Sequence, residues 1–326
     1  MTVQITIIGL GKIGASLGLA LKSQTHQLTR VGHDRSISTM RTAEKMGMVD
    51  RTENNLHAAV EKADIVYLAL PLDEIRPTLE EIAPDLMDGS AVIDASILPH
   101  TVCAWAQELL PAGRHFISAL PTLNSNYLDD TTTGIDGAHE DLFKNGLFVI
   151  SSPPNTDSDA LKLAADLGLL VGAHTLFSDP LEVQGLTSAS YLAPRLVAAA
   201  FMNALTAQPG WLEGRKVAGQ LLSQITLPAD SFDEQKQTGA AVLYNKENTV
   251  RVLNDIMLAI RDLRDIIEDG SEDELRKQLE QAQTGRGTWL AQRRTRDWDT
   301  ILEAPKMPTS GDIFSRFFGF RRRKKE

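Results

Sequence analysis

The sequence has almost no cysteine: Cys103 is the only one in 326 residues. A single thiol cannot form a disulfide within the chain and cannot build a cysteine-rich metal site. Cys103 lies among apolar neighbours, so we predict a small core residue rather than a reactive thiol. The seven histidines do not repeat at the spacing of metal ligands, and we therefore expect no metal site.

Basic residues are in the minority, with 33 Lys and Arg against 43 Asp and Glu and a net charge of -10. This balance gives the body of the protein no electrostatic reason to bind nucleic acid. Long apolar runs are missing as well. The nearest candidate, residues 192–205, is interrupted by Arg195 and is shorter than the ~18 residues that span a bilayer. No basic segment precedes an apolar run at the start, so no secretory signal is indicated and we expect a cytoplasmic protein.

The first half of the chain alternates short apolar runs with helical patterns, which is typical of a parallel sheet with crossover helices. The apolar runs are continuous, as expected for strands that helices cover on both faces. Predicted strands occupy residues 4–8, 29–33, 65–69, 91–94, 115–119, 147–151 and 173–177. Predicted helices between them occupy residues 13–23, 37–46, 56–62, 73–86, 101–110 and 157–167.

From about residue 178 strand signals end and long helical patterns begin, over residues 180–205, 214–226, 233–264 (with a break near Gly239) and 272–296. Gly270 is expected to end one helix, and Ser271 with Glu274 to form a capping box for the next. We predict an α/β Rossmann domain over residues 1–178, followed by an all-α dimerisation and substrate domain over residues 179–304. For the basic segment 305–326 we expect a flexible tail or, alternatively, a short amphipathic segment that touches an anionic membrane or a partner groove.

Glycines 9, 11 and 14 form a G-x-G-x-x-G pattern directly after the first predicted strand and directly before the first helix. In this context Gly9 permits a tight turn, Gly11 lets a pyrophosphate approach the backbone, and Gly14 lets the helix pack on the strand. The phosphates are then expected at the free N–H groups of the helix N-terminus. The pattern predicts a nicotinamide dinucleotide site that also includes Leu10, Lys12 and Ile13.

Asp34 ends the second apolar run, 20 residues after Gly14. An acidic side chain there accepts hydrogen bonds from the ribose hydroxyls and repels a 2′-phosphate, which favours NAD over NADP. Arg35 leaves this choice open, because an arginine can pair with that phosphate or lie over the adenine. Leu70 and Pro71 end another predicted strand, at the sheet edge where nucleotide and substrate meet, and we assign them to the cofactor site.

Polar residues follow the next two strands at the same edge. The Ser96 hydroxyl is suited to bind nicotinamide or substrate, although a helix-capping role explains it equally well. Asn124, Asn126 and Tyr127 lie in a later loop, where they could bind a polar substrate or simply form an ordinary polar loop.

Several blocks of the sequence resemble the prephenate/arogenate dehydrogenase family, over residues 3 to about 296. The resemblance implies a Rossmann domain, a helical dimerisation domain, a homodimer, and oxidative decarboxylation of prephenate or arogenate in tyrosine biosynthesis. Such a reaction needs a hydride acceptor, a base near the ring hydroxyl, and cationic groups for the substrate carboxylates. The blocks are GLGKIGASLGLAL, VGHDR, YLALPLDEI, HEDLFKNGLFVISSP, residues 179–205 and residues 247–289.

The sequence departs from this family at its motif histidines. The family's His-Pro-Met-Ala-Gly stretch, whose histidine handles the hydroxyl proton, corresponds to Leu120-Pro121. The Glu-His-Asp and His-x-Pro-His steps correspond to 182–184 and 192–195. Arg195 is then expected to bind a substrate anion, which makes Ser96, Asn124 and Arg195 the catalytic candidates and leaves the base unassigned.

The leading hypothesis is an NAD-dependent dehydrogenase of this family that acts on a small-molecule carboxylate. Two alternatives stay open. One is an NAD-binding regulatory or scaffold homologue without turnover, which the missing histidines suggest. The other is a dehydrogenase of another small carboxylic acid that uses Arg195 and the loop around Asn124.

Overall fold

A computed structural model describes residues 3–24, 28–230 and 232–298 of the chain. The chain divides into two compact units, Met1–Leu258 and Ala259–Glu326. The predicted basic tail, 305–326, lies outside the described residues. The domain boundaries predicted near residues 178 and 304 stay predictions.

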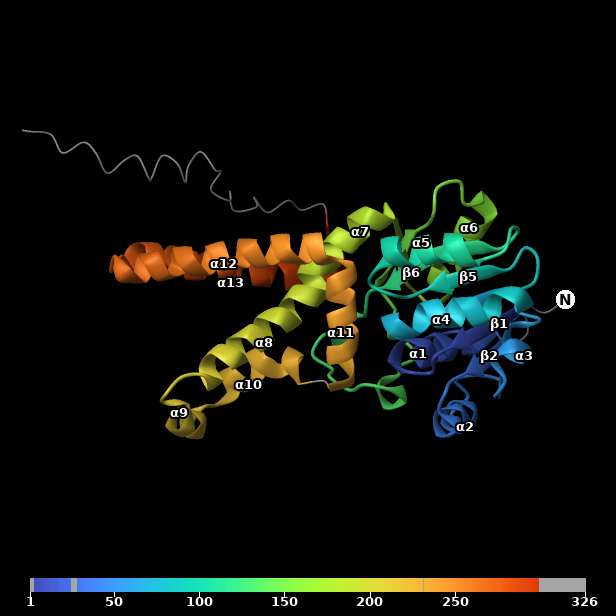
Figure 1. Ribbon diagram of the computed structural model, residues 1–326, viewed down its shortest axis with the longest axis horizontal. Helices are drawn as coiled ribbons and strands as arrows, with labels where there is room; N and C mark the ends of the chain where they lie inside the picture. Colours follow the sequence, from blue (N-terminus) through green and yellow to red (C-terminus); the bar gives the residue numbers. More distant parts are fainter. Residues whose placement is uncertain (1–2, 25–27, 231, 299–326) are drawn as a thin grey trace, which may run out of the picture. The chain divides into compact units, whose positions relative to one another are not determined.

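An eight-stranded sheet forms the centre of the first unit, with the strand order β3-β2-β1-β4-β5-β6-β7-β8 (Figure 1). The seven predicted strands are all present, and the predicted α/β Rossmann class with a helical region after it is confirmed. The strands are β1 (Val3–Ile8), β2 (Leu28–His33), β3 (Arg51–Thr52), β4 (Ile65–Leu68), β5 (Ala91–Asp94), β6 (His115–Pro121), β7 (Leu147–Ser151) and β8 (His174–Phe177).

Two features of the sheet differ from the prediction. Strand β3 was not predicted, because its two residues are too few to show a period-two pattern. Strand β7 runs antiparallel to β6, whereas the alternating pattern predicted a parallel sheet with crossover helices. The connection between them, residues 122–146, contains two 3₁₀ turns where a parallel strand would need a crossover helix. The sheet is therefore mixed.

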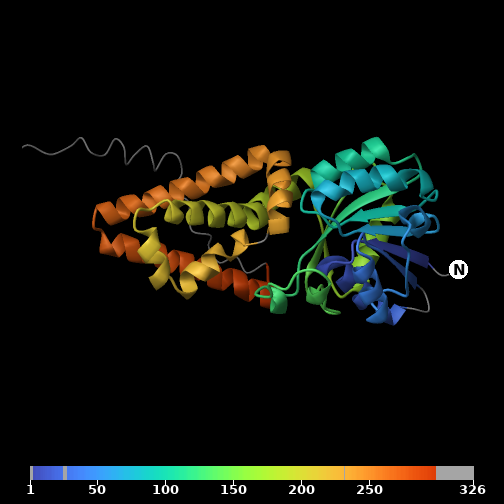
Figure 2. The same cartoon turned by 60° about the horizontal axis from the view of Figure 1, so that its bottom comes forward.

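Helices cover both faces of the sheet (Figure 2). One face packs against α1, α2 and α6 around Ile7 and Ile93, and the other packs against α3, α4 and α5 around Val66 and Val92. Cys103 lies in the second cluster and is buried, which confirms its predicted place in the core. The helices are α1 (Lys12–Ala20), α2 (Ile37–Lys45), α3 (Leu56–Val60), α4 (Leu72–Ile82), α5 (Pro99–Leu109) and α6 (Ser158–Leu170).

After β8 the first unit continues with helical elements. The helix predicted over 180–205 is interrupted by a π turn, Ser188–Leu192. Pro194 has no N–H to donate, and the Ala193 N–H bonds back to the Ser188 carbonyl, so one extra residue bulges out. The helices are α7 (Pro180–Thr187), α8 (Ala193–Thr206), α9 (Trp211–Val217), α10 (Gln220–Thr226), α11 (Phe232–Tyr244) and α12 (Lys246–Glu268).

The helix break predicted near Gly239 is wrong, because α11 continues through Gly239 and the interruption falls at Asn245. Asn245 is buried, and its Nδ2 donates to the Gln184 carbonyl at 2.8 Å and to the Ser188 hydroxyl at 2.6 Å. These contacts come from an element some 60 residues away, and they place the break at Asn245.

In the second unit, α12 ends at Glu268. Gly270, with φ 66°, follows it, which confirms the predicted end of this helix, and α13 (Glu272–Thr295) comes next. The predicted capping box is wrong. Ser271 is the N-cap residue, but its side chain makes no capping hydrogen bond, since its backbone (φ -83°, ψ 89°) departs from the extended conformation of a capping serine. Among the described residues, no helix is long and apolar enough to cross a membrane.

Candidate functional site

The turn after β1 has the geometry that its glycines predict. Gly9 has φ +91°, and a Cβ on it would lie 2.4 Å from the Ala69 carbonyl oxygen. The Gly9 N–H donates to the His33 carbonyl at 2.9 Å, which ties the turn to the end of β2. Only glycine fits this conformation and this close approach.

The other two glycines have different surroundings. A Cβ on Gly14 would lie 1.9 Å from the Gly9 carbonyl oxygen, so the close packing of α1 on β1 requires glycine. Apart from Gly11 and its two chain neighbours, no described atom lies within 4 Å of a Cβ on Gly11, which leaves open space in front of the helix N-terminus. Gly11 is the N-cap and no side chain caps the helix, so the first N–H groups of α1 are available to an anion.

Asp34 lies against the glycine turn, but it also has a structural task that we did not predict. One carboxylate oxygen accepts the Leu10 N–H at 2.9 Å, and the other accepts the Ser36 N–H at 2.8 Å. Each oxygen keeps a lone pair for a further donor such as a ribose hydroxyl. Next to it, the exposed Arg35 guanidinium forms an ion pair with Glu74 at 2.5 Å.

The Lys12 side chain turns away from the helix terminus. Its Nζ donates to the Asp130 carboxylate at 2.9 Å and to the Thr132 carbonyl at 3.1 Å. This hydrogen bond from Lys12 holds the pKa of Asp130 far below its usual range. The Ser16 hydroxyl accepts the His139 N–H at 3.0 Å, so the β6–β7 connection is fixed over the first turns of α1. Lys12 thus anchors a loop, a role that its place in the glycine motif does not indicate.

Leu70 and Pro71 lie just after β4, which ends at Leu68. The Leu70 Cδ2 atom lies 3.1 Å from the position of a Cβ on Gly9, and Pro71 is the N-cap of α4. Both are half-buried. The structure therefore brings these residues together with Gly9 and Asp34 at one edge of the sheet.

The end of β5 holds a buried carboxylate. Asp94 is 0% exposed, and its Oδ2 accepts the Ser96 hydroxyl at 2.6 Å. Burial raises the pKa of Asp94 to about 7, although the hydrogen bonds from Ser96 act in the opposite direction. Its Oδ1 has no hydrogen-bond partner among the described residues. We predicted Ser96 as a site residue but not the buried Asp94 behind it, although an aspartate that ends an apolar strand two residues before a serine was a visible signal.

The predicted loop residues Asn124, Asn126 and Tyr127 form hydrogen bonds within the β6–β7 connection itself. Asn124 is buried; its Oδ1 accepts the Asn126 N–H at 3.1 Å, and its Nδ2 donates to the Asp141 carbonyl at 3.2 Å. The Tyr127 hydroxyl donates to the Asp141 carboxylate at 2.5 Å. These contacts favour the ordinary polar loop over a substrate-binding role.

Comparisons with known proteins place the chain. A family model for "Prephenate dehydrogenase, nucleotide-binding domain" matches residues 17–177. The chain is similar to prephenate dehydrogenase from Bacillus subtilis, with 28% identity over 200 residues (61% of this chain, 53% of that protein). It is also similar to prephenate dehydrogenase from Lactococcus lactis, with 30% identity over 161 residues (49% of this chain, 44% of that protein). The chain belongs to the prephenate/arogenate dehydrogenase family.

The alignments span about half the length of these curated relatives. Solved structures share the fold over more of the chain. The arogenate dehydrogenase of Synechocystis has a TM-score of 0.71 at 24% identity and covers 88% of this chain and 100% of its own. The prephenate dehydrogenase of A. aeolicus, solved with hydroxyphenyl propionate and NAD+, has a TM-score of 0.77 at 20% identity, with 88% and 98% covered.

Two positions at which family members are expected to carry histidines are apolar in this chain and pack together. Leu120, in β6, and Val183, in α7, form one buried cluster with Val149. Neither side chain can accept a proton. Arg195 lies in the first turn of α8 and is half-buried. In the part of the chain that the structure describes, no group of three or more His, Cys, Asp or Glu residues is arranged to hold a metal ion.

Proposed function

We propose that this protein is an NAD-dependent dehydrogenase that oxidises prephenate or arogenate with loss of carbon dioxide, in tyrosine biosynthesis. The observation that carries the proposal is the glycine turn: open space at Gly11, uncapped N–H groups at the start of α1, and Asp34 beside them. These are the groups that a dinucleotide needs at its pyrophosphate and ribose. Family membership supplies the substrate class.

Each part of this edge has a task in the proposed reaction. The bound nicotinamide supplies the hydride acceptor. The N–H groups at Lys12 and Ile13 bind the pyrophosphate, and Leu70 with Pro71 borders the nicotinamide. Arg195 offers a cation for a substrate carboxylate, because a guanidinium pairs with carboxylates in a fixed geometry.

Asp34 is the reason to propose NAD over NADP. Its carboxylate repels a 2′-phosphate, and the neighbouring Arg35 guanidinium already pairs with Glu74. The test is NADH formation by the full-length protein with prephenate and with arogenate, each with NAD and with NADP. We expect turnover with NAD and one of these acids; no turnover with either acid would contradict the proposal.

A matched variant connects turnover to the glycine turn. Gly11→Ala adds a methyl group where no described protein atom lies, so the fold should be unchanged. The same methyl enters the space proposed for the pyrophosphate, and NADH affinity in a fluorescence titration should fall about tenfold or more. Unchanged affinity would place the dinucleotide elsewhere.

The apolar pair Leu120 and Val183 favours a second candidate, a homologue that binds NAD and acts as a regulatory subunit without turnover. NADH binding with no oxidation of either acid would support this candidate. A panel of small hydroxy acids in the same assay tests the third hypothesis, a dehydrogenase of another carboxylic acid.

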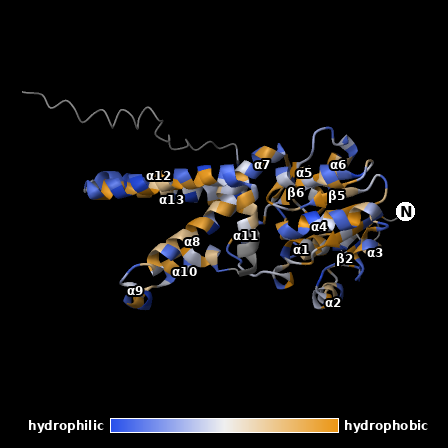
Figure 3. Cartoon of the chain, in the orientation of Figure 1, coloured by the Kyte–Doolittle hydropathy of each residue, from blue (hydrophilic) through white to orange (hydrophobic). Residues whose placement is uncertain are grey.

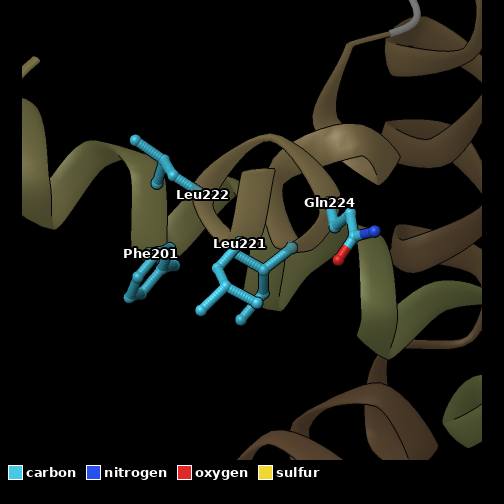
Figure 4. Close-up of a pocket in the computed structure, with 5 residues that line it drawn as sticks. Phe201, Leu221, Leu222 and Gln224 are labelled. Carbon is cyan, nitrogen blue, oxygen red and sulfur yellow. The ribbon is translucent and has the colours of Figure 1, made fainter. Parts of the chain in front are cut away.

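We also propose that the protein is a homodimer joined through its helical region. An apolar groove of about 520 Å³ lies between α8 and α10, lined by Phe201, Leu221, Leu222, Gln224 and Ile225 (Figure 4). Leu221 is 82% exposed, which costs free energy unless a partner covers it. Light scattering should give a mass of about twice 35.7 kDa; a monomer would contradict the proposal.

A further inference from the structure

Ser96 connects a buried carboxylate to the edge of the sheet. Its Oγ donates to Asp94 Oδ2 at 2.6 Å, and Ser96 itself is half-buried while Asp94 is fully buried. The other oxygen of Asp94 has no partner among the described residues. When the Ser96 hydroxyl takes up a proton, the Asp94 carboxylate can therefore accept the proton that Ser96 gives up.

The groups around Asp94 do not compete for that proton. The titratable side chains that face it are Tyr67 from β4 and Cys103 from α5. Burial raises the pKa of both, that of Cys103 to about 12, so both are uncharged near neutral pH. Ser118, its neighbour on β6, does not titrate.

Ser96 also lies next to the position where a family member would carry its histidine. Asp94 is paired with Ser118 across the sheet, and Leu120 is two residues further along the same strand. Ile97, the residue after Ser96, packs against the buried cluster that contains Leu120. Leucine cannot take a proton, whereas the Ser96 hydroxyl, two residues after the end of β5, donates to a carboxylate that can accept one.

We propose that Ser96 and Asp94 form the proton relay of the dehydrogenase reaction. This inference rests on the proposed function. As Ser96 Oγ takes the proton of the substrate ring hydroxyl, it passes its own proton to Asp94 Oδ2. Ser96 touches the substrate, and Asp94 acts through Ser96.

The relay balances the reaction. The C–H bond of the carbon that bears the hydroxyl breaks and its electron pair leaves as hydride to the nicotinamide, while the O–H bond breaks and a carbonyl forms. The bond to the ring carboxylate then breaks, carbon dioxide leaves, and the electron pair moves through the ring to the carbonyl oxygen. That oxygen takes the proton back from Asp94 through Ser96, which yields the phenol. A phenol has a pKa of about 10, so the return is downhill from a carboxyl of lower pKa.

The proton is therefore borrowed and returned, with none released to water. A carboxylate enclosed behind a single serine suits this task, because it needs no separate exit. A base that released its proton to solvent would need an exposed position.

The experiment compares Asp94→Asn and Ser96→Ala with Ser118→Ala in the full-length protein. Ser118 is a matched control, because it is equally buried, its Oγ also lacks a partner among the described residues, and it neighbours Asp94 across the sheet. For each variant, kcat for NADH formation is measured against pH, and NADH affinity by titration.

We expect both relay variants to lower kcat by about 100-fold or more, the usual contribution of a general base. NADH affinity should stay within about twofold, since the dinucleotide binds elsewhere on the edge. The wild-type kcat should rise as pH increases through about 7, because Asp94 must be ionised to accept the proton; Asp94→Asn should lose this rise. Ser96→Thr, which keeps a hydroxyl, should recover at least about tenfold over Ser96→Ala, and Ser118→Ala should keep the wild-type profile.

Each contrary result has a distinct meaning. If Asp94→Asn keeps both its kcat and the rise near neutral pH, the relay is wrong and the proposed function stands. If Ser118→Ala loses as much as Asp94→Asn, the loss is structural and the relay is again wrong. A wild-type protein that binds NADH but oxidises neither acid overturns the relay and the proposed function together. Should Asp94→Asn fail to fold, the kcat values of Ser96→Ala and Ser96→Thr test the relay. Equal kcat values for these two variants would then contradict it.

Discussion

The sheet and the helices that follow it bury their apolar residues very differently. In β1 and the turn after it, Ile5, Ile7 and Leu10 are fully buried. In α9 and α10, by contrast, Val217 is 87% and Leu221 is 82% exposed. In Figure 3, which colours each residue by its hydropathy, hydrophobic residues recur along α8 and α10. The sheet completes its own core, whereas the helices after it present apolar faces that still need a cover.

The two regions differ in the same way at their glycines. Around the dinucleotide turn a Cβ on Gly9, Gly14 or Gly18 would meet a carbonyl oxygen within 2.4 Å. On the helices, Gly214 and Gly239 have no described atom within 4 Å of that position outside their chain neighbours and their own helix backbone. Close backbone packing marks the region that is proposed to bind the dinucleotide, and open surroundings mark the region that is proposed to meet a partner.

The largest effect is expected from a substitution that disrupts the packing of α1 on β1. Gly14→Ala forces α1 away from β1, because the new Cβ would lie 1.9 Å from the Gly9 carbonyl oxygen. We expect a loss of about 3 kcal/mol in the free energy of unfolding and loss of measurable NADH binding. Denaturant unfolding with the matched variant Gly214→Ala is the control: alanine in the open helix site should stabilise by up to about 1 kcal/mol. Equal changes in the free energy of unfolding for Gly14→Ala and Gly214→Ala would contradict the difference in packing between the two regions.

The second prediction concerns Asp94, whose burial should make the free energy of unfolding depend on pH. The folded state holds the pKa of Asp94 at about 7, above its unfolded value of 3.8, so folding favours the protonated form. The stability contribution is full at low pH and is lost as pH rises through about 7. From about pH 5 to pH 8 the wild type should lose roughly 2–3 kcal/mol more than Asp94→Asn, measured by urea unfolding. Parallel pH profiles of the two proteins would contradict this prediction.

The third prediction tests whether a second subunit covers the helices. Leu221→Asp places a charge in the groove between α8 and α10 and should weaken dimerisation by about tenfold or more. Leu169→Asp, at a 58% exposed leucine of α6, is the matched control and should leave the dimer unchanged. Sedimentation equilibrium measures both. A dimer weakened only by Leu169→Asp would place the interface on the sheet region.

The smallest effect concerns cofactor choice. Asp34→Ala should weaken NAD binding by about tenfold and NADP binding by less, because the repulsion of the 2′-phosphate is removed as well. Arg35→Ala, at the next residue, should change NAD binding by less than about twofold, since its guanidinium pairs with Glu74. Fluorescence titration with both reduced cofactors is the measurement. Equal losses for the two cofactors would mean that Asp34 acts through its hydrogen bond to Leu10 alone.

Local patterns predicted most of the elements. Continuous apolar runs predicted seven strands, because most positions of a strand covered on both faces are apolar. The glycine spacing predicted the turn after β1 because backbone conformation and close packing exclude other residues there. Strand β3, the direction of β7 and the break at Asn245 were not predictable, since each depends on contacts with distant parts of the chain.

The sequence by itself determined the α/β class, the glycine turn and the position of Asp34 beside it. Each of these follows from residue type and local spacing. Only the tertiary structure decided that Lys12 anchors the β6–β7 connection, that Leu120 packs on Val183, and that Asp94 is buried behind Ser96. These facts join residues that are far apart in the chain, or depend on how deeply the fold encloses a side chain, and burial is set by the whole fold.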